Sequence, residues 1–286
     1  MPVKTGSRTE EEVRSHKAPV TSGRQSEVFD HGVIIDEITD QLTKKGYTIY
    51  DTEYRGSTNL NVVHGVFYLG KGSDPNMGKA FTFSNNYEAP NEFVCSSAAY
   101  EMSTLMIMIP SYLERTPAKT KFLVSEGMNR IVDHTSLIRA GYDELIKWKE
   151  TLINTGISAR EQATIIGRLY AQYNLLTLTQ IGMVKKEIEA ARVRTKISAI
   201  TAWEMYQNIQ VALMDTHPRT IIESFSTLQD YFMKELNAAP EDFISKQTEE
   251  AENPKPIERE PVKEEKVRAT APQEVYKSPM PSVVFL

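Results

Sequence analysis

The chain has 286 residues, of which 40% are apolar and 25% are charged, and its formal net charge is −5. This length allows one large domain or two small ones, and the modest apolar fraction indicates that part of the chain lies outside any core. The negative charge argues against bulk electrostatic binding of nucleic acid, but it leaves room for a local basic patch.

The first 27 residues are polar and show no hydrophobic periodicity, which predicts a flexible arm over residues 1–27. The pattern changes at Asp30, whose carboxylate is suited to cap a helix. Apolar residues then recur at helical spacing up to Leu42, and Gly46 follows two lysines, as is typical of a helix end. The sequence therefore predicts a helix between Asp30 and Gly46.

Three β-rich runs follow this helix, at residues 47–55, 60–69 and 79–87. Tyr, Thr, Val and Phe are frequent in them and turn residues separate them, which predicts an antiparallel three-stranded meander. Residues 93–95 predict a further buried strand, whereas the apolar run 105–109 is compatible with a strand or a buried helix. Residues 28–125 are thus expected to form an α/β meander.

Residues 126–237 are predicted to be a helical region packed on this meander. Ser158 and Glu161 have the spacing of a capping box, in which each side chain bonds the other residue's backbone N–H. Pro218 is expected at the start of a last helix, because proline lacks an N–H that this position leaves unpaired. One face of that helix carries an apolar stripe, formed by Ile221, Phe225, Leu228, Phe232 and Leu236.

Residues 238–286 differ in composition, with many charges of both signs and six prolines after Pro240. Such a segment cannot bury enough apolar surface to fold alone, so a disordered tail is predicted. Its apolar tip consists of Val283, Val284, Phe285 and Leu286. The tip is suited to dock in a partner's groove or to add a strand to a sheet, unless it folds back on its own body or frays. The predicted fold class is α+β: an N-terminal helix and a small antiparallel sheet, then a helical bundle and the tail.

No catalytic constellation is evident in the sequence, so we expect neither an enzyme nor a cofactor. Gly70-Lys71-Gly72 lacks the later glycine and the following helix of a phosphate-binding loop, and it predicts a hairpin loop. Ordinary core or surface roles explain the scattered histidines better than a metal site does. These histidines are His16, His31, His64, His134 and His217.

The single cysteine, Cys95, excludes an internal disulfide and favours a reducing compartment. No apolar run approaches the ~18 residues that a membrane-spanning helix needs. The first eight residues also lack the apolar run of a secretory signal. We therefore expect a cytoplasmic protein that does not bind a membrane.

Two segments are candidates for recognition. The densest basic run carries Lys185, Lys186, Arg192, Arg194 and Lys196. On a helix it offers a stripe that would contact phosphates, or an ordinary solvated face paired with neighbouring glutamates. The second candidate ends the third predicted strand and consists of Asn85, Asn86 and Tyr87. These side chains would contact bases or a peptide, or else form an Asn-rich turn.

Short motifs in the chain resemble a phage- and plasmid-encoded family, domain of unknown function 932 and its relatives. Asn85-Asn86-Tyr87 matches the family's Asn-Ser-Tyr/His, although Glu88 replaces the Asp that follows. Val94-Cys95-Ser96 matches a second block, in which Ser97 replaces an Asn. Residues 201–208 are similar to the family's Thr-Ala-Trp-Asp-Leu-Tyr-Asn-Ala helix. The resemblance covers residues 30–237 and implies a phage or mobile-element origin, but the family has no assigned activity.

The predicted helix, three-stranded meander and helix are similar to the core of phage single-strand annealing proteins. The tail ending in Phe285-Leu286 resembles the partner-recruiting tail of bacterial single-strand-binding proteins. These likenesses favour a non-enzymatic phage protein of DNA metabolism, located in the host cytoplasm. It would be a homo-oligomer that binds single-stranded DNA weakly and recruits a protein partner through its tail. The alternatives are a virion or assembly protein whose termini lace neighbouring subunits, and an inhibitor of a host protein.

Overall fold

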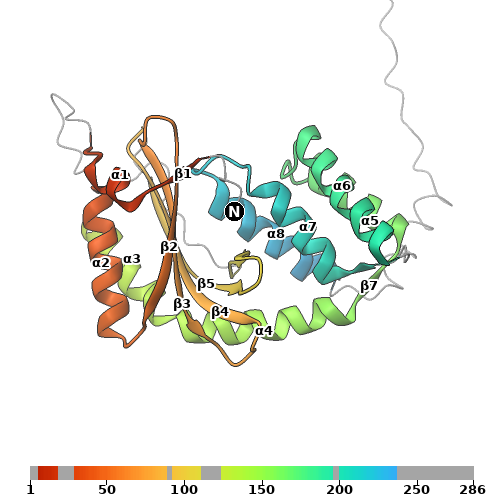
Figure 1. Ribbon diagram of the computed structural model, residues 1–286, viewed down its shortest axis with the longest axis horizontal. Helices are drawn as coiled ribbons and strands as arrows, with labels where there is room; N and C mark the ends of the chain where they lie inside the picture. The colour runs from red at the N-terminus through yellow and green to blue at the C-terminus, as the bar shows by residue number, and fades with distance from the viewer. Residues whose placement is uncertain (1–5, 19–28, 89–91, 111–123, 196–199, 237–286) are drawn as a thin grey trace, which may run out of the picture. The chain divides into compact units, whose positions relative to one another are not determined.

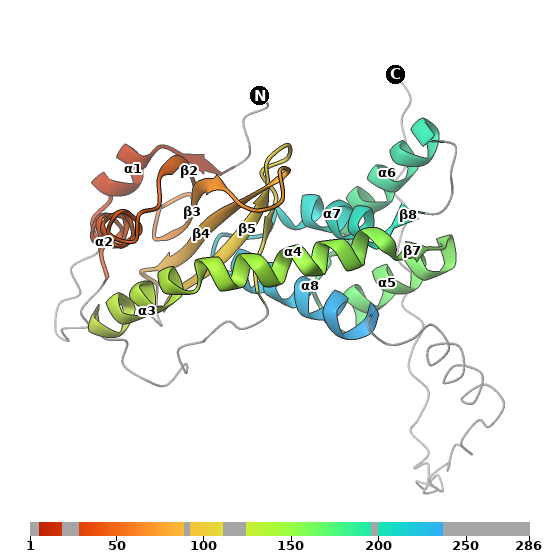
Figure 2. The same cartoon turned by 90° about the horizontal axis from the view of Figure 1, so that it is seen from below.

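The computed structural model (Figure 1, Figure 2) describes residues 6–18, 29–88, 92–110, 124–195 and 200–236. The chain divides into two units, Met1–Ala239 and Pro240–Leu286, and all described residues lie in the first. The predicted tail and its tip, Val283, Val284, Phe285 and Leu286, lie outside the described residues. Within those residues the predicted α+β class is confirmed, because an antiparallel sheet is combined with helices.

A six-stranded antiparallel sheet is the main β element of the described residues, and its strands follow one another in chain order. They are β1 Ser7–Arg8, β2 Ile49–Gly56, β3 Val62–Lys71, β4 Met77–Asn86, β5 Glu92–Glu101 and β6 Ile107–Met108. The predicted meander is confirmed as β2 to β4, and the predicted buried strand at residues 93–95 is part of β5. The sheet is nevertheless twice as wide as the meander, because β1, β5 and β6 extend it at both edges.

One face of the sheet packs against α1 Glu10–Ser15, α2 His31–Lys44 and α3 Val124–Ser136. Strand alternation turns Phe67, Phe83 and Cys95 toward these helices, where they are buried. The helix between Asp30 and Gly46 is confirmed as α2. Asp30 accepts a hydrogen bond from the Gly32 N–H, and Gly46 has the positive φ, 78°, that a helix-ending glycine supplies.

Buried residues on the other face of the sheet form a separate hydrophobic cluster with the later helices. These are α4 Ile138–Asn154, α5 Ala159–Ala171, α6 Leu178–Thr195, α7 Ala202–Leu213 and α8 Ile221–Leu236. Among them, α4 contacts β4, β5 and α7, while α8 contacts β4 and β6. A short ladder of β7 Gly156–Ile157 and β8 Ile200–Thr201 brings the end of α4 next to the start of α7 (Figure 2).

Local sequence signals explain where several of these helices begin. The capping box at Ser158 and Glu161 is confirmed at the start of α5, and Thr201 and Glu204 form a second one at the start of α7. The stripe on α8 is confirmed for its first four members, Ile221, Phe225, Leu228 and Phe232, each at most 1% exposed. The side chain of Leu236 is not described.

The prediction of a flexible arm is wrong for residues 6–18. Ser7 and Arg8 pair with β2, and a capping box formed by Thr9 and Glu12 starts α1. Val13 is fully buried against α2 and the sheet. A six-residue helix with one buried apolar side chain is too short to show periodicity, so the sequence pattern concealed it.

Two other predictions need correction. Pro218 does not start the last helix, because α8 begins at Ile221 and Pro218 lies in the preceding turn. The helical region is interrupted by β7 and β8. The ambiguous run 105–109 contains a strand, β6, which pairs with Ala99 and Tyr100.

Candidate functional site

The predicted recognition residues at the end of β4 are buried. Asn85, Asn86 and Tyr87 are 3%, 2% and 6% exposed. The Asn85 amide donates to the Phe29 carbonyl at 2.7 Å and contacts Nδ1 of His31 at 2.9 Å. The Tyr87 hydroxyl accepts from the His31 N–H at 2.7 Å. Asn85 and Tyr87 therefore tie the start of α2 to the sheet, whereas Asn86 Oδ1 accepts from the Glu88 N–H. All three residues are buried in this conformation, and their contact with bases or a peptide stays a prediction.

An aromatic stack continues this buried contact. The rings of His31, Tyr87 and His16 form a three-membered cluster, in which the centroid of Tyr87 is 4.0 Å from that of His31 and 5.9 Å from that of His16, and the two histidine centroids are 6.3 Å apart. Burial is the main cause that lowers the pKa of His31 to about 4; the nearby charge of His16 adds to it, while the hydrogen bond to the Leu60 carbonyl opposes it. His31 is therefore neutral near pH 7 and serves to join α2, the β2–β3 turn and the N-terminal segment.

A polar layer lies on the opposite face of the sheet. Nε2 of His64 is 2.9 Å from the hydroxyl of Thr82, and burial, followed by the charge of Arg55, lowers the pKa of His64 to about 3. The Arg55 guanidinium donates to the Met214 carbonyl, and Ser84 donates to the Pro218 carbonyl at 3.0 Å. These contacts connect the sheet to the α7–α8 turn, so we assign them a structural role.

The predicted basic run lies on α6. Lys185 and Lys186 are exposed, whereas Val184 and Ile188 on the same helix are buried. Neither lysine forms an ion pair within the described part of the chain. Arg192 and Arg194 belong to the last turns of α6, but their side chains are not described, and Lys196 is outside the described residues. The alternative that this helix face is paired with neighbouring glutamates therefore has no support at Lys185 and Lys186.

Basic residues outnumber acidic ones in the segment that contains these lysines. From the start of α5 to the end of α6, residues 159–195, the chain carries six basic and three acidic residues, although its overall net charge is −5. Arg160 is exposed, and Arg168 pairs with Glu235 of α8. Tyr170, on α5, is 43% exposed. The segment therefore combines exposed cations with an accessible aromatic ring.

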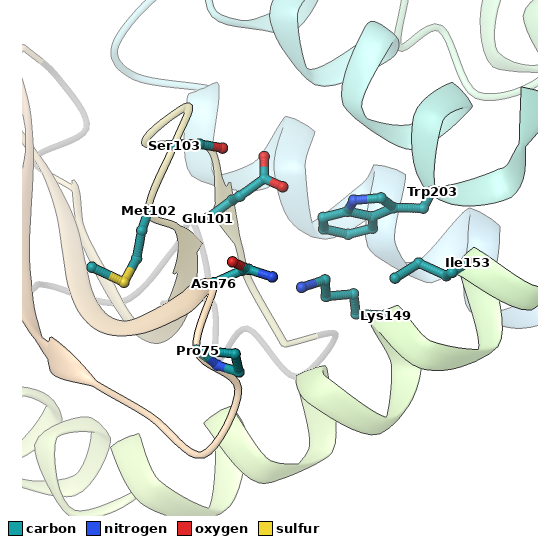
Figure 3. Close-up of a pocket in the computed structure, with 8 residues that line it drawn as sticks. All are labelled: Pro75, Asn76, Glu101, Met102, Ser103, Lys149, Ile153 and Trp203. Atoms are coloured by element: carbon teal, nitrogen blue, oxygen red, sulfur yellow. The ribbon is translucent and has the colours of Figure 1, made fainter.

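A pocket of about 470 Å³ is lined by residues of other elements (Figure 3). The β3–β4 turn, the β5–β6 turn, α4 and the start of α7 supply its lining. The lining residues are Pro75, Asn76, Glu101, Met102, Ser103, Lys149, Ile153 and Trp203. Sequence analysis did not identify this pocket, because its residues come from four elements and form no motif along the chain.

Lys149 provides the buried cation of the pocket. Its Nζ is 2.7 Å from Oδ2 of Asp74 and 5.7 Å from the ring centroid of Trp203. Burial alone would raise the pKa of Asp74, but hydrogen bonds from Lys149 and from the Asn76 N–H outweigh it and lower that pKa. Asp74 is thus ionised near neutral pH, and its contact with Nζ holds Lys149 on one side of the pocket.

Glu101 provides the anionic wall. Its Oε2 accepts hydrogen bonds from Gln207 of α7 and from Thr104, both at 2.7 Å. Oε1 accepts no hydrogen bond from any described residue. In Figure 3 the Glu101 carboxylate points into the space between the β5–β6 turn and Trp203, while the Asn76 amide points toward Lys149. The pocket therefore offers donors on one side and an acceptor on another.

The described residues contain no group of three or more His, Cys, Asp or Glu that could hold a metal ion. None of their helices is long and apolar enough to cross a membrane. No family model, no curated protein and no solved structure matches the chain. The resemblance to domain of unknown function 932 stays a prediction.

Proposed function

We propose that the protein acts by binding single-stranded DNA weakly through the surface of α5 and α6. The observation that carries this proposal is the concentration of six basic residues between positions 159 and 195 of an acidic chain. Phosphate binding is driven by cations that displace counterions, so a local basic surface suffices even when the net charge is negative. Exposed Lys185 and Lys186 would contact the backbone.

The aromatic content of this surface favours single strands over duplex DNA. Binding of single strands combines a basic surface with rings on which unpaired bases stack. Tyr170 is the accessible ring of α5, and it belongs to the same segment as Arg160. Bases in a duplex are already stacked on one another, so they would gain nothing from Tyr170.

The wider proposal places the protein in phage or mobile-element DNA metabolism, as a non-enzymatic homo-oligomer. Its tip, Val283 to Leu286, would recruit a protein partner. An oligomer would repeat the α5–α6 surface along a strand, which compensates for weak binding at each copy.

The test is fluorescence anisotropy of a labelled thymine oligonucleotide at about 50 mM salt, where electrostatic affinity is high. The variant Lys185→Glu/Lys186→Glu should bind on the order of tenfold more weakly than the unmodified chain. Its control is Lys71→Glu/Lys147→Glu, which changes the net charge equally at two other exposed lysines. Absence of binding by the unmodified chain would overturn the proposal and favour an assembly or inhibitor role. Equal losses in both variants would show that only net charge matters.

A further inference from the structure

We propose that the pocket between the β3–β4 turn, the β5–β6 turn, α4 and α7 binds a guanine base. The proposal does not rest on DNA binding by α5 and α6, because the pocket residues lie on other elements, apart from those helices. A volume of about 470 Å³ is sufficient for a purine and part of its sugar.

The walls of the pocket favour a flat ligand with apolar faces. The indole of Trp203 is 8% exposed, and Tyr206 fixes it from within the core by stacking at an interplanar angle of 12°. Ile153 and Met102 are 43% and 36% exposed on other sides of the pocket. Lys149 Nζ lies over the indole, so Trp203 closes the pocket beside that cation, and the exposed side chains of Ile153 and Met102 provide the apolar contacts for the faces of a base.

The polar groups restrict which base is complementary. A Lys ammonium only donates hydrogen bonds, so ligand atoms that face Lys149 must be acceptors. An ionised carboxylate only accepts, so ligand atoms that face Glu101 must be donors. The Asn76 amide, which makes no side-chain hydrogen bond to another described residue, adds a second donor beside Lys149.

Guanine matches this arrangement better than the other bases do. It has two adjacent donors, N1–H and the N2 amino group, and two adjacent acceptors, O6 and N7. Lysine contacts to O6 and N7 are a common specific mode of guanine recognition. Adenine and cytosine each have one amino donor, and thymine places its N3–H between two carbonyls. These three bases would leave Glu101 or Lys149 incompletely paired, and an unpaired polar group costs affinity.

The test is isothermal titration calorimetry of the full chain with GMP, AMP, CMP and UMP. We expect saturable binding of GMP that is at least about tenfold tighter than that of the other three, since one good polar match is worth roughly 1–3 kcal/mol. Absence of saturable GMP binding, or equal affinity for all four nucleotides, would overturn the proposal.

Variants assign the binding to this pocket. Glu101→Gln replaces an acceptor-only group by an amide and should abolish the preference for GMP over AMP. Because Glu101 also bonds Gln207 and Thr104, a second variant is needed that spares folding. Asn76 is exposed, and Asn76→Asp replaces the amide donor that would face O6 or N7 by a carboxylate, which repels these acceptor atoms. It should weaken GMP binding about tenfold or more. Lys147→Met, at an exposed position of α4, is the control. If Glu101→Gln and Asn76→Asp both bind GMP as tightly and as selectively as the unmodified chain does, GMP does not bind in this pocket.

A second comparison shows whether the bound guanine belongs to a DNA strand or to a free nucleotide. A thymine oligonucleotide with one terminal guanine is measured against the all-thymine oligonucleotide. If the pocket receives a base from a strand, the guanine strengthens binding, and Asn76→Asp removes this gain. If the guanine adds nothing although GMP binds, the ligand is a nucleotide that is not part of a strand. The Lys185→Glu/Lys186→Glu variant should retain GMP binding in either case.

Discussion

Lys149 of α4 and Asp74 of the β3–β4 turn form an ion pair in which Nζ and Oδ2 are 2.7 Å apart. The same turn is held by Tyr142, whose hydroxyl accepts from the Asp74 N–H at 3.2 Å. A Cβ at Gly72 would lie 1.8 Å from the Tyr142 ring, so only glycine fits there. These contacts fix the turn against α4 and thereby position Asn76 and Lys149 in the pocket.

The first prediction concerns this ion pair. The two side chains are 7% and 18% exposed, so removing one partner leaves the other charge poorly solvated. Lys149→Met and Asp74→Asn should each lower the free energy of unfolding by about 2–4 kcal/mol. The double variant should lose clearly less than the sum of the two. Urea denaturation measures all three, and strictly additive losses would show that the pair does not couple the turn to α4.

The second prediction concerns the buried end of β4. Tyr87→Phe removes the acceptor of the His31 N–H and should destabilise the protein by about 1–3 kcal/mol, because a buried donor is left unpaired. Binding of the thymine oligonucleotide should not change. Tyr50→Phe, at a side chain that is 71% exposed, is the control and should shift stability by less than about 0.5 kcal/mol. Loss of DNA affinity in a folded Tyr87→Phe protein would instead support Asn85, Asn86 and Tyr87 as binding residues.

The third prediction is a pH dependence of stability. The pKa of His31 is about 4 in the folded protein, below its ordinary value of 6.5, so the unfolded chain binds more protons between these values. Stability should be full above about pH 6.5 and should fall as the pH decreases toward 4, by roughly 1–2 kcal/mol at pH 5 from this residue.

His64, whose pKa is lowered to about 3, should add a loss of the same sign. Denaturant midpoints between pH 5 and 7.5 measure both contributions. His31→Gln should flatten the dependence, and an unchanged profile in this variant would contradict the assignment to His31.

The fourth prediction concerns the N-terminal segment. Val13→Asp places a charge in a fully buried site of α1 and should lower stability by about 3 kcal/mol or more, because the carboxylate has no partner there. Val33→Asp makes the same substitution at a side chain that is 45% exposed on α2. It should have little effect. Equal midpoints for the two variants would mean that α1 contributes nothing to the core.

Much of the fold follows from local signals that are visible in the sequence. The helix α2 was predictable because Asp30 and Gly46 mark its two ends and the apolar spacing between them is regular. The hairpin of β3 and β4 was predictable because a glycine-rich loop separates two β-branched and aromatic runs. The width of the sheet was not predictable, since β1 and β6 are two residues long and are specified by pairing with distant strands.

Some residues of the candidate sites could likewise be predicted from the sequence, and others could not. Lys185 and Lys186 stand out in the sequence because like charges cluster, and exposure on α6 agrees with that interpretation. Asn85 is a polar residue in a β-rich run, and the sequence cannot show that a buried histidine from another element pairs with it. Glu101, Lys149 and Trp203 meet only because β5, α4 and α7 pack together, so no spacing along the chain reveals them.

The most direct measurement is the salt dependence of oligonucleotide affinity for the unmodified chain and for Lys185→Gln/Lys186→Gln. If both lysines neutralise phosphates of a single strand, the slope of log affinity against log salt should be smaller in the variant by about 1.4, or about 0.7 for each phosphate that is no longer neutralised. Identical slopes for the two proteins, with measurable binding by both, would show that α6 is not the surface that binds DNA.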